Sequence, residues 1–332
     1  MNTLNKHQFG FSLIELMVAM VIGLLLMSGA ISLLMSNQRI YREQNEIGLL
    51  QENARFITEL LHKDIRRSTF VGCVDDIEQV TNNLGGITDT SLRSFDISAT
   101  TNLIEGSESG ANWQPSNSAD VVGTMLAGSD GITVRYLKST GITLTASMAS
   151  AADNINTDGI GSLVDGAYVA IGDCGGTDIF QVTTATGDST AAVLTHPGLS
   201  RTYPAGSQIY ILGTYRYGVG NSASGTSNSL WRMTPAGTEE LAEGVENMQI
   251  LYGEDTSNDG LADTFVDADT VADWSNVVAV KMAILMSTID ENSTNDVDTT
   301  PYSLLGTVVG PMNDQRRRRT FIQTIQIRNK RI

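Results

Sequence analysis

The sequence predicts an α+β protein in which one long N-terminal helix packs on a β-rich globular domain. Three observations support this class. An apolar run extends from Phe11 to Met35, an apolar pattern of helical period continues to about Arg67, and short alternating apolar segments fill the remainder. Helices repeat about every 3.6 residues and strands every two. We therefore expect a polar N-terminal segment (1–10), a helix (11–67) and a globular domain (68–332).

The apolar run is long enough to cross a membrane. Its 25 residues would form a helix of about 37 Å, which exceeds a hydrocarbon core of about 30 Å. Glu15 is the only charged residue in the run, and a carboxylate at the centre of such a helix costs roughly 2.5 to 3.5 kcal/mol, less near the interface. Lys6 and His7 precede the run, which favours a cytoplasmic N-terminus and places the rest of the chain outside.

Two simpler interpretations compete for the same segment. A secretory signal would be cut after Ala30, at the end of the small-residue sequence SGA. Signal cores usually hold about 7 to 15 uninterrupted apolar residues, whereas this run is longer and contains Glu15. A plain membrane anchor explains the length of the run but gives Glu15 no role.

The helical pattern continues without a break beyond the membrane-length run. Apolar residues recur at helical spacing at Ile40, Ile47, Leu50, Ala54, Ile57 and Leu61. The sequence has no proline before Pro115, and Gly72 is a stop signal shortly after Arg67. We expect one helix to Arg67, with 11–35 in the membrane and the second half packed on the globular domain. A coiled coil is the alternative, but the stripe covers fewer than four heptads.

The region from about residue 68 predicts one β-rich domain with long loops and no clear linker. Stretches near 82–118, 140–162 and 220–229 resemble loops because small and polar residues dominate them. Expected strands lie in the segments GITVRYL, YVAIGDC, DIFQVTT, SQIYILGTYRYG, LWRM, NMQILYG and VVAVKMAILM.

Charge is distributed unevenly along this region. Residues 68–315 contain 31 acidic and 7 basic residues, whereas the last 17 residues contain 7 basic and no acidic ones. The acidic body disfavours nucleic acid as a direct partner. In the tail RRRRTFIQTIQIRNKRI, Phe321, Ile325 and Ile327 fall on alternating positions, which is typical of a strand face. We expect a terminal strand whose arginines contact the acidic surface; a basic patch for nucleic acid or anionic lipid is the alternative.

The two cysteines predict a disulfide. Cys73 follows the expected helix and Cys174 lies in an expected strand, and most of the chain is expected to be exported into an oxidising compartment. The motif GDCGG around Cys174 superficially resembles the nucleophile loop of chymotrypsin-like proteases. That chemistry needs a histidine base and an orienting acid, and His7, His62 and His196 offer no recognisable set. We therefore do not expect an enzyme.

An acidic stretch, DTSNDGLADTF, spaces four oxygen-bearing residues like calcium ligands. Asp255, Ser257, Asp259 and Asp263 fall at loop positions 1, 3, 5 and 9, and Gly260 falls at the sharp turn. Val266 occupies position 12, where a bidentate glutamate would belong, so Asp267 or Asp269 would have to replace it. Weak calcium binding is one expectation, and an acidic hairpin loop without metal is the other. No other cofactor is expected.

The sequence G-FSLIE at residues 10–15 resembles the type IV pilin family, which includes minor pilins and the pseudopilins of type II secretion. The resemblance implies that residues 1–10 are a leader, that prepilin peptidase cuts between Gly10 and Phe11, and that Phe11 is then N-methylated. It also implies that Glu15, the fifth mature residue, pairs with the N-terminal amine of Phe11, its own or a neighbour's, during assembly.

Three further blocks narrow the resemblance to PilW-type minor pilins of type IV pili. They are LQENARFITELLHKDIRRSTFVGC, EGVENMQILYGEDTSNDGLAD and RRRRTFIQTIQIRN. The resemblance implies a low-abundance subunit that helps to initiate pilus assembly in a tip complex with other minor pilins and the major pilin. Adhesion and twitching motility would follow from the filament. The implied location is the inner membrane, with the globular domain in the periplasm, and then the pilus. A J-like pseudopilin of a type II secretion system is the alternative.

Overall fold

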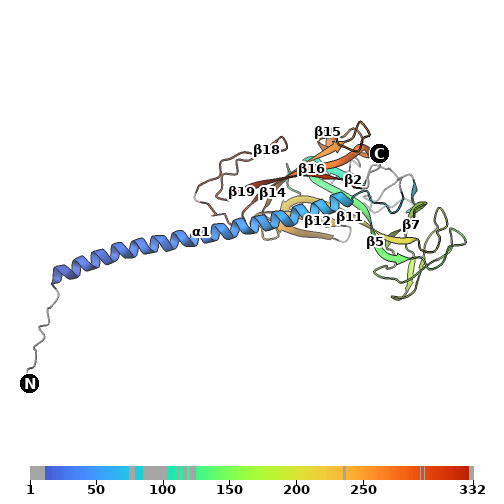
Figure 1. Ribbon diagram of the computed structural model, residues 1–332, viewed down its shortest axis with the longest axis horizontal. Coiled ribbons are helices and arrows are strands. Elements are labelled where there is room, and N and C mark those ends of the chain that lie inside the picture. The colour runs from blue at the N-terminus through green and yellow to red at the C-terminus, as the bar shows by residue number, and fades with distance from the viewer. Residues whose placement is uncertain are drawn as a thin grey trace, which may run out of the picture.

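A single helix, α1 (Leu13–Arg67), forms the N-terminal part of the computed structural model and projects far beyond the β-rich head (Figure 1). The structure describes residues 12–74, 79–84, 103–110, 112–114, 118–119, 125–234, 237–291, 293–294 and 296–328. Among these residues, α1 is the one helix long and apolar enough to cross a membrane. The predicted α+β class, with one long helix and a β-rich head, is confirmed.

Most of the described strands belong to two sheets. The larger sheet has the order β1 (Val80–Asn82), β8 (Gly176–Gln181), β7 (Tyr168–Asp173), β11 (Gln208–Asn221), β5 (Gly131–Thr143), β2 (Ile104–Ser107), β3 (Asn112–Gln114) and β4 (Ser118–Ala119), and β12 (Asn228–Thr234) and β13 (Gly237–Glu243) branch from β11. The C-terminal sheet has the order β15 (Thr264–Val266), β14 (Val245–Glu254), β16 (Val277–Ser287) and β19 (Arg318–Gln326).

Two small sheets and three short 3-10 helices complete the described elements. The small sheets are β6 (Ile155–Thr157), β10 (Ala192–Thr195) and β9 (Thr184–Gly187), and the hairpin β17 (Tyr302–Leu304) and β18 (Thr307–Val309). The 3-10 helices are η3 (Glu108–Gly110), η4 (Ala268–Thr270) and η5 (Trp274–Asn276). Each of the seven predicted strand segments contains a strand. Two stretches predicted as loops also contain strands: β2 and β3 lie within 82–118, and β6 lies within 140–162.

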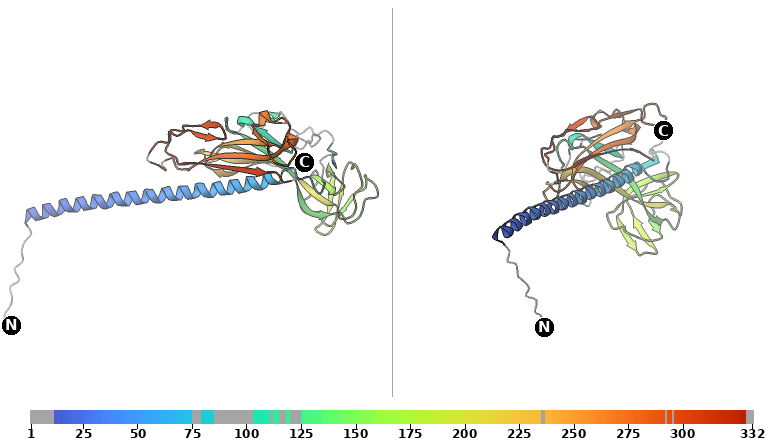
Figure 2. Two further views of the ribbon diagram at one scale, coloured as in Figure 1. Left: turned by 45° about the horizontal axis from the view of Figure 1, so that its top comes forward. Right: turned by 60° about the vertical axis from the view of Figure 1, so that its left-hand side comes forward.

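The head contains two main hydrophobic cores. Strands β5 and β11 pair along most of their length and pass from one core into the other. We call residues 138–211 the distal lobe. Its core includes Ile155, Phe180 and Leu194, all fully buried. The lobe lies at the end of the head farthest from the N-terminus of α1, and Figure 2 shows the same placement from two other directions.

The larger core joins α1 to both large sheets. The helical stripe enters it at Leu50, and Ile57, Leu61 and Ile65 are fully buried against strands that include β5, β11, β14 and β16. Burying one such side chain contributes about 1.5 to 3 kcal/mol. Ile40, the first predicted member of the stripe, is 49% exposed. The head therefore covers only the last third of the helix.

A buried carboxylate fixes the last turn of α1 to the larger sheet. Asp64 is 4% exposed and accepts hydrogen bonds from Tyr217 Oη, from Tyr136 Oη at 3.3 Å and from Arg67 Nη2 at 2.8 Å. Burial and the neighbouring Asp64 carboxylate raise the pKa of Tyr217 above its usual value, so this tyrosine remains a donor. The contact links three segments that are distant in sequence.

The predicted disulfide joins the chain after α1 to the β7–β8 turn. Cys73 and Cys174 are bonded, with Cα atoms 4.6 Å apart and a sequence separation of 101. Cys174 was expected in a strand but lies one residue beyond β7, in the turn. Gly72 has φ +105°, which favours glycine, and Thr177 Oγ1 donates to Val71 O at 3.1 Å. The bond therefore ties the helix end to the distal lobe.

Replacing Asp64 tests the helix–head junction. We expect Asp64→Ala to lower the free energy of unfolding by about 2 to 4 kcal/mol, because two buried tyrosine hydroxyls lose their acceptor. Asp64→Asn keeps one acceptor oxygen and should cost less. Denaturant titration of the full chain in detergent measures both variants. An Asp64→Ala loss below that of Asp64→Asn would contradict this role.

Thiol labelling tests the disulfide. We expect no alkylation of the purified, unreduced chain and labelling of both cysteines after reduction. In the chain-entropy model, closing a loop of about 100 residues stabilises the head by about 4 to 5 kcal/mol at most, so reduction should lower its unfolding temperature. Labelling of both thiols without reductant would refute the bond.

Candidate functional site

The exposed half of α1 carries most of the exposed large apolar side chains of the described chain. From Leu13 to Met35 its large apolar side chains are between 46% and 78% exposed, and none of the most apolar window is buried within the protein. Apolar patches of this extent mark sites that contact a membrane or other protein. The cover for this surface must come from outside the chain.

Glu15 completes the N-terminal cap of this helix. Ser12 is the N-cap, and its hydroxyl accepts from the amide of Ile14 at 3.4 Å. The Glu15 carboxylate reaches back to accept from the amide of Ser12 at 3.0 Å, which forms a capping box. An anion in the first helical turn is also favoured by the helix dipole, by about 0.3 to 1 kcal/mol. Gly10 and Phe11, the predicted cleavage and methylation residues, lie outside the described residues.

The exposed apolar surface continues as a narrower face beyond the membrane-length run. Tyr41, Leu49 and Phe56 are 73%, 38% and 48% exposed, and their spacings of eight and seven residues place them on one side of α1. Leu50, Ala54 and Ile57 occupy the opposite, buried side. This outer face is positioned to contact a neighbouring elongated element.

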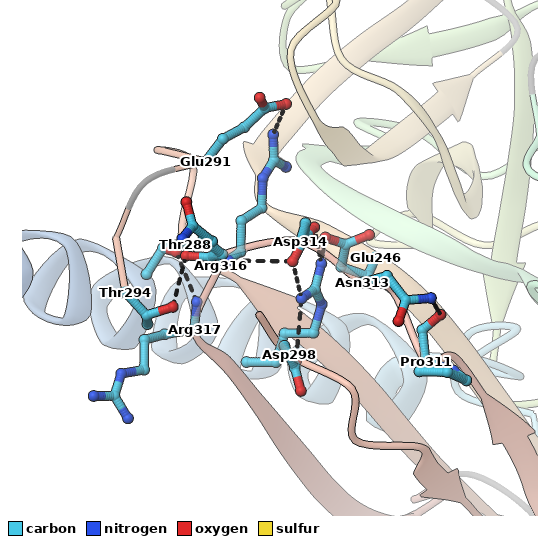
Figure 3. Close-up of polar contacts among 12 residues, drawn as sticks. Glu246, Thr288, Glu291, Thr294, Asp298, Pro311, Asn313, Asp314, Arg316 and Arg317 are labelled. Atoms are coloured by element: carbon cyan, nitrogen blue, oxygen red, sulfur yellow. Dashed lines mark hydrogen bonds and ion pairs between the residues drawn. The ribbon is translucent and has the colours of Figure 1, made fainter. Parts of the chain in front are cut away.

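The C-terminal arginines form ion pairs within the protein, as the acidic surface predicted. The side chain of Arg318 is 1% exposed and contacts Glu246 at 3.1 Å, Asp298 at 3.2 Å and Asp314 at 2.6 Å. Figure 3 shows how these three acids gather. The guanidinium of Arg318 holds the pKa of the Asp314 carboxyl below its usual value. The ion pairs between the buried Arg318 and these three acids fix the segment before β19 against the C-terminal sheet.

Two neighbouring arginines connect this segment to other parts of the molecule. Arg316 Nη2 donates to Thr226 O, in the β11–β12 loop, at 2.6 Å, and contacts Glu291 at 3.1 Å. Arg317 contacts Glu43 of α1 at 2.6 Å. These pairings favour a structural role for the basic run over the alternative of a nucleic-acid or lipid patch.

The GDCGG motif has a structural role in this fold. The sulfur of Cys174 is bonded to Cys73 and is not a free nucleophile. His62 Nδ1 contacts Gln323 Nε2 at 2.8 Å. His196 Nδ1 accepts from the Gly198 amide at 3.1 Å, and its Nε2 lies 2.9 Å from Asp153 O. Both histidines that the structure describes therefore bond to groups other than Cys174.

The acidic loop uses its carboxylates to bind its own backbone. Asp255 accepts from the amides of Asp259 and Gly260, at 3.2 and 2.7 Å. Asp263 accepts from the amides of Thr256 and Ser257, at 2.7 and 2.8 Å. Within the described ranges, no group of three His, Cys, Asp or Glu side chains is placed to hold a metal ion. Calcium binding by Asp255, Ser257, Asp259 and Asp263 stays a prediction.

Sequence patterns did not reveal the buried contacts of Asp64 and Arg318. Asp64 lies among helical residues with ordinary charge spacing, and Arg318 is one of four consecutive arginines. A carboxylate on the apolar side of a helix was the available signal for Asp64, since it follows Ile57 and Leu61 at helical spacing. The partners of Arg318 come from segments that only the fold brings together.

Comparison with protein-family models gives two matches. Residues 5–31 match the prokaryotic N-terminal methylation motif, which includes the exposed start of α1 and Glu15. Residues 216–329 match the type IV pilus-assembly protein W family, from the second half of β11 to the end of β19. No curated protein matches the sequence.

These two matches agree with the geometry of the molecule. The methylation motif marks a membrane-anchored pilin N-terminus, and the PilW match includes the C-terminal sheet on which α1 packs. Together they support a minor pilin-like role in type IV pili. Over these two stretches, which together span less than half of its length, the chain is similar to a prepilin-like protein of the PilW type.

Proposed function

We propose that this chain is a low-abundance subunit that helps to initiate type IV pilus assembly, in a complex with other minor pilins at the pilus tip. The observation that carries the proposal is the division of α1 into two parts. The head buries side chains of the helix only from Leu50 onward, and the apolar half up to Met35 is exposed. Before assembly this half would lie in the bilayer, and after assembly it would lie in a bundle of similar helices. Both environments exclude water.

The same proposal assigns an orientation in the inner membrane. Residues 1–10 face the cytoplasm, residues 11–35 cross the bilayer, and the head lies in the periplasm. Lys6 and His7 support this direction because basic residues favour the cytoplasmic side. Prepilin peptidase then cuts between Gly10 and Phe11, and Phe11 is N-methylated. The matched methylation motif supports this processing.

Glu15 changes partner in the proposed assembly step. Before assembly its carboxylate caps its own helix through the Ser12 amide. In the apolar bundle it meets the charged N-terminal amine of Phe11, its own or a neighbour's. Such a pair attracts strongly where water is excluded, and removing one member strands the other. Glu15 would therefore align a subunit along the axis of the assembly.

The outer face of α1 provides a second proposed contact. Tyr41, Leu49 and Phe56 continue the membrane-length apolar surface into the region beside the head. A neighbouring pilin-type helix that lies parallel to α1 would cover both parts at once. Partners without a membrane-spanning helix would meet only the outer part.

For the acidic loop we retain weak calcium binding as a proposal. Imperfect extracellular sites bind calcium with dissociation constants of about 10⁻⁴ to 10⁻³ M. Ser257 and Asp259 supply the remaining oxygens, and Asp255 and Asp263 would have to exchange backbone amides for the ion.

Substitution of Glu15 tests the assembly proposal. In a strain that lacks the native gene, we expect Glu15→Ala to insert and fold normally but to enter pili at least tenfold less, because breaking a buried ion pair costs about 3 to 5 kcal/mol. The measurement is the amount of the chain and of major pilin in sheared pili, relative to the membrane fraction.

Two variants separate the possible reasons for a defect. Glu15→Gln keeps a side-chain oxygen for the cap but lacks the charge, so we expect it to behave like Glu15→Ala. Glu52→Ala removes an exposed glutamate from the same helix and should assemble normally. Normal piliation by Glu15→Ala would contradict the proposal.

A further inference from the structure

The distal lobe has an unusual surface composition. From Ser139 to Ser200 the chain contains no lysine, arginine or glutamate, and aspartate is its only ionised residue type at neutral pH apart from any protonated His196. Most exposed positions hold Ser, Thr, Asn, Asp, Gly or Ala. Long charged side chains are the usual surface residues of soluble proteins. The lobe therefore presents a polar surface made of short side chains.

Such a surface is suited to binding because little side-chain entropy is lost on contact. Immobilising Lys, Arg or Glu costs up to about 1.5 to 2 kcal/mol per side chain, and short residues cost less. Binding loops in other proteins use Ser, Gly and Asn for adaptable hydrogen bonding. The lobe is rich in the same residues from Ser139 to Ser200.

One depression on this surface has the dimensions of a small-ligand site. A cup of about 440 Å³ is lined by Ser147, Met148, Asp153, Asn154, Asn156 and Val193. Small-molecule sites usually measure about 300 to 1,000 Å³. Val193 of β10 pairs with Asn156 of β6 in the sheet register, so these two strands form one wall.

The loop that forms the rest of the cup is fixed before any ligand arrives. Asp153 accepts from the amides of Ala149 and Ser150, both at 2.8 Å, and from the Ser150 hydroxyl at 2.9 Å. Hydrogen bonds from Ser150 and Ala149 lower the pKa of Asp153 below its usual value. His196 holds the same residue through Asp153 O, and Ser147 Oγ accepts from the Ala205 amide at 3.0 Å.

Two asparagines provide uncommitted polar groups at this site. The side chains of Asn154 and Asn156 are exposed and make no hydrogen bond to another residue of the described part of the chain. Each amide offers two donor hydrogens and one acceptor oxygen. Met148 and Val193 add an apolar side to the same cup. Neighbouring hydroxyls and C–H groups of a sugar ring match this combination.

We propose that the cup of the distal lobe binds a neutral saccharide. Asn154 and Asn156 would bond its hydroxyls, and Met148 and Val193 would contact its C–H face. Asp153 is the one acidic or basic side chain in the lining of the cup, so a sialylated or sulfated sugar would meet a carboxylate there. The lobe that carries the cup lies at the end of the head opposite the N-terminus of α1, away from the segment that would be embedded (Figures 1 and 2). The inference does not rest on the proposed role in pilus initiation.

The test uses the full chain in lipid nanodiscs on an array of immobilised neutral and acidic oligosaccharides, followed by titration of the best neutral ligand. We expect retention on neutral sugars and none on sialylated or sulfated ones. Asn154→Ala with Asn156→Ala should raise the dissociation constant at least tenfold. Ser162→Ala, an exposed lobe residue outside the cup, should leave it unchanged.

A second variant guards against a folding defect. Asn154→Lys places a long side chain at an exposed loop position and should block the cup without changing the unfolding temperature. The proposal fails if no neutral saccharide is retained, if only acidic sugars bind, or if binding survives both the double variant and Asn154→Lys in folded protein.

Discussion

The exposed apolar half of α1 is the constraint on which the rest of the structure depends. A surface that runs from Leu13 to Met35 without cover is incompatible with water, so the chain must be embedded before it can be stable. The head does not cover this surface. Its contacts with the middle of the helix include the Arg317–Glu43 ion pair and the bond from the Asp290 amide to Glu46. The helix is thereby left free for lipid or for neighbouring helices.

The same helix must also hold the head at a defined angle. Ile57, Leu61 and Ile65 fill the space between the two large sheets, and Asp64 fixes the last turn through two tyrosines of β5 and β11. The disulfide then connects the chain beyond the helix to the distal lobe. Helix, larger core and lobe are consequently joined at one place, close to the C-terminal end of α1. A partner that binds along the helix would position the lobe as well.

The sequence predicted those parts of the fold that repeat along the chain, and it did not predict those that depend on distant contacts. The period of α1 and the alternation in β14 and β16 were readable because local geometry sets both. The division of the head into two cores was not readable, since β5 and β11 each look like one strand and only their partners change along their length. The short strands β2, β3 and β6 lie in polar stretches, where three or four residues show no recognisable period.

The candidate site shows the same distinction. Glu15 stood out because a carboxylate in an apolar run has a cost that demands an explanation, and Cys73 and Cys174 could pair only with each other. The partners of Arg318 come from β14 and from the segment between β16 and β19, so no local sequence pattern predicted them. Charge counts alone predicted that the basic run would meet acidic groups, but not that one of its arginines would be buried.

Mass spectrometry of pili sheared from the cell surface tests the central claim most directly. A chain that is processed as a pilin and enters the filament should appear there as a minor component, with an N-terminal peptide that begins at N-methylated Phe11. A chain found only in the membrane fraction that still begins at Met1, or an exported chain that begins at Ile31, would contradict the account.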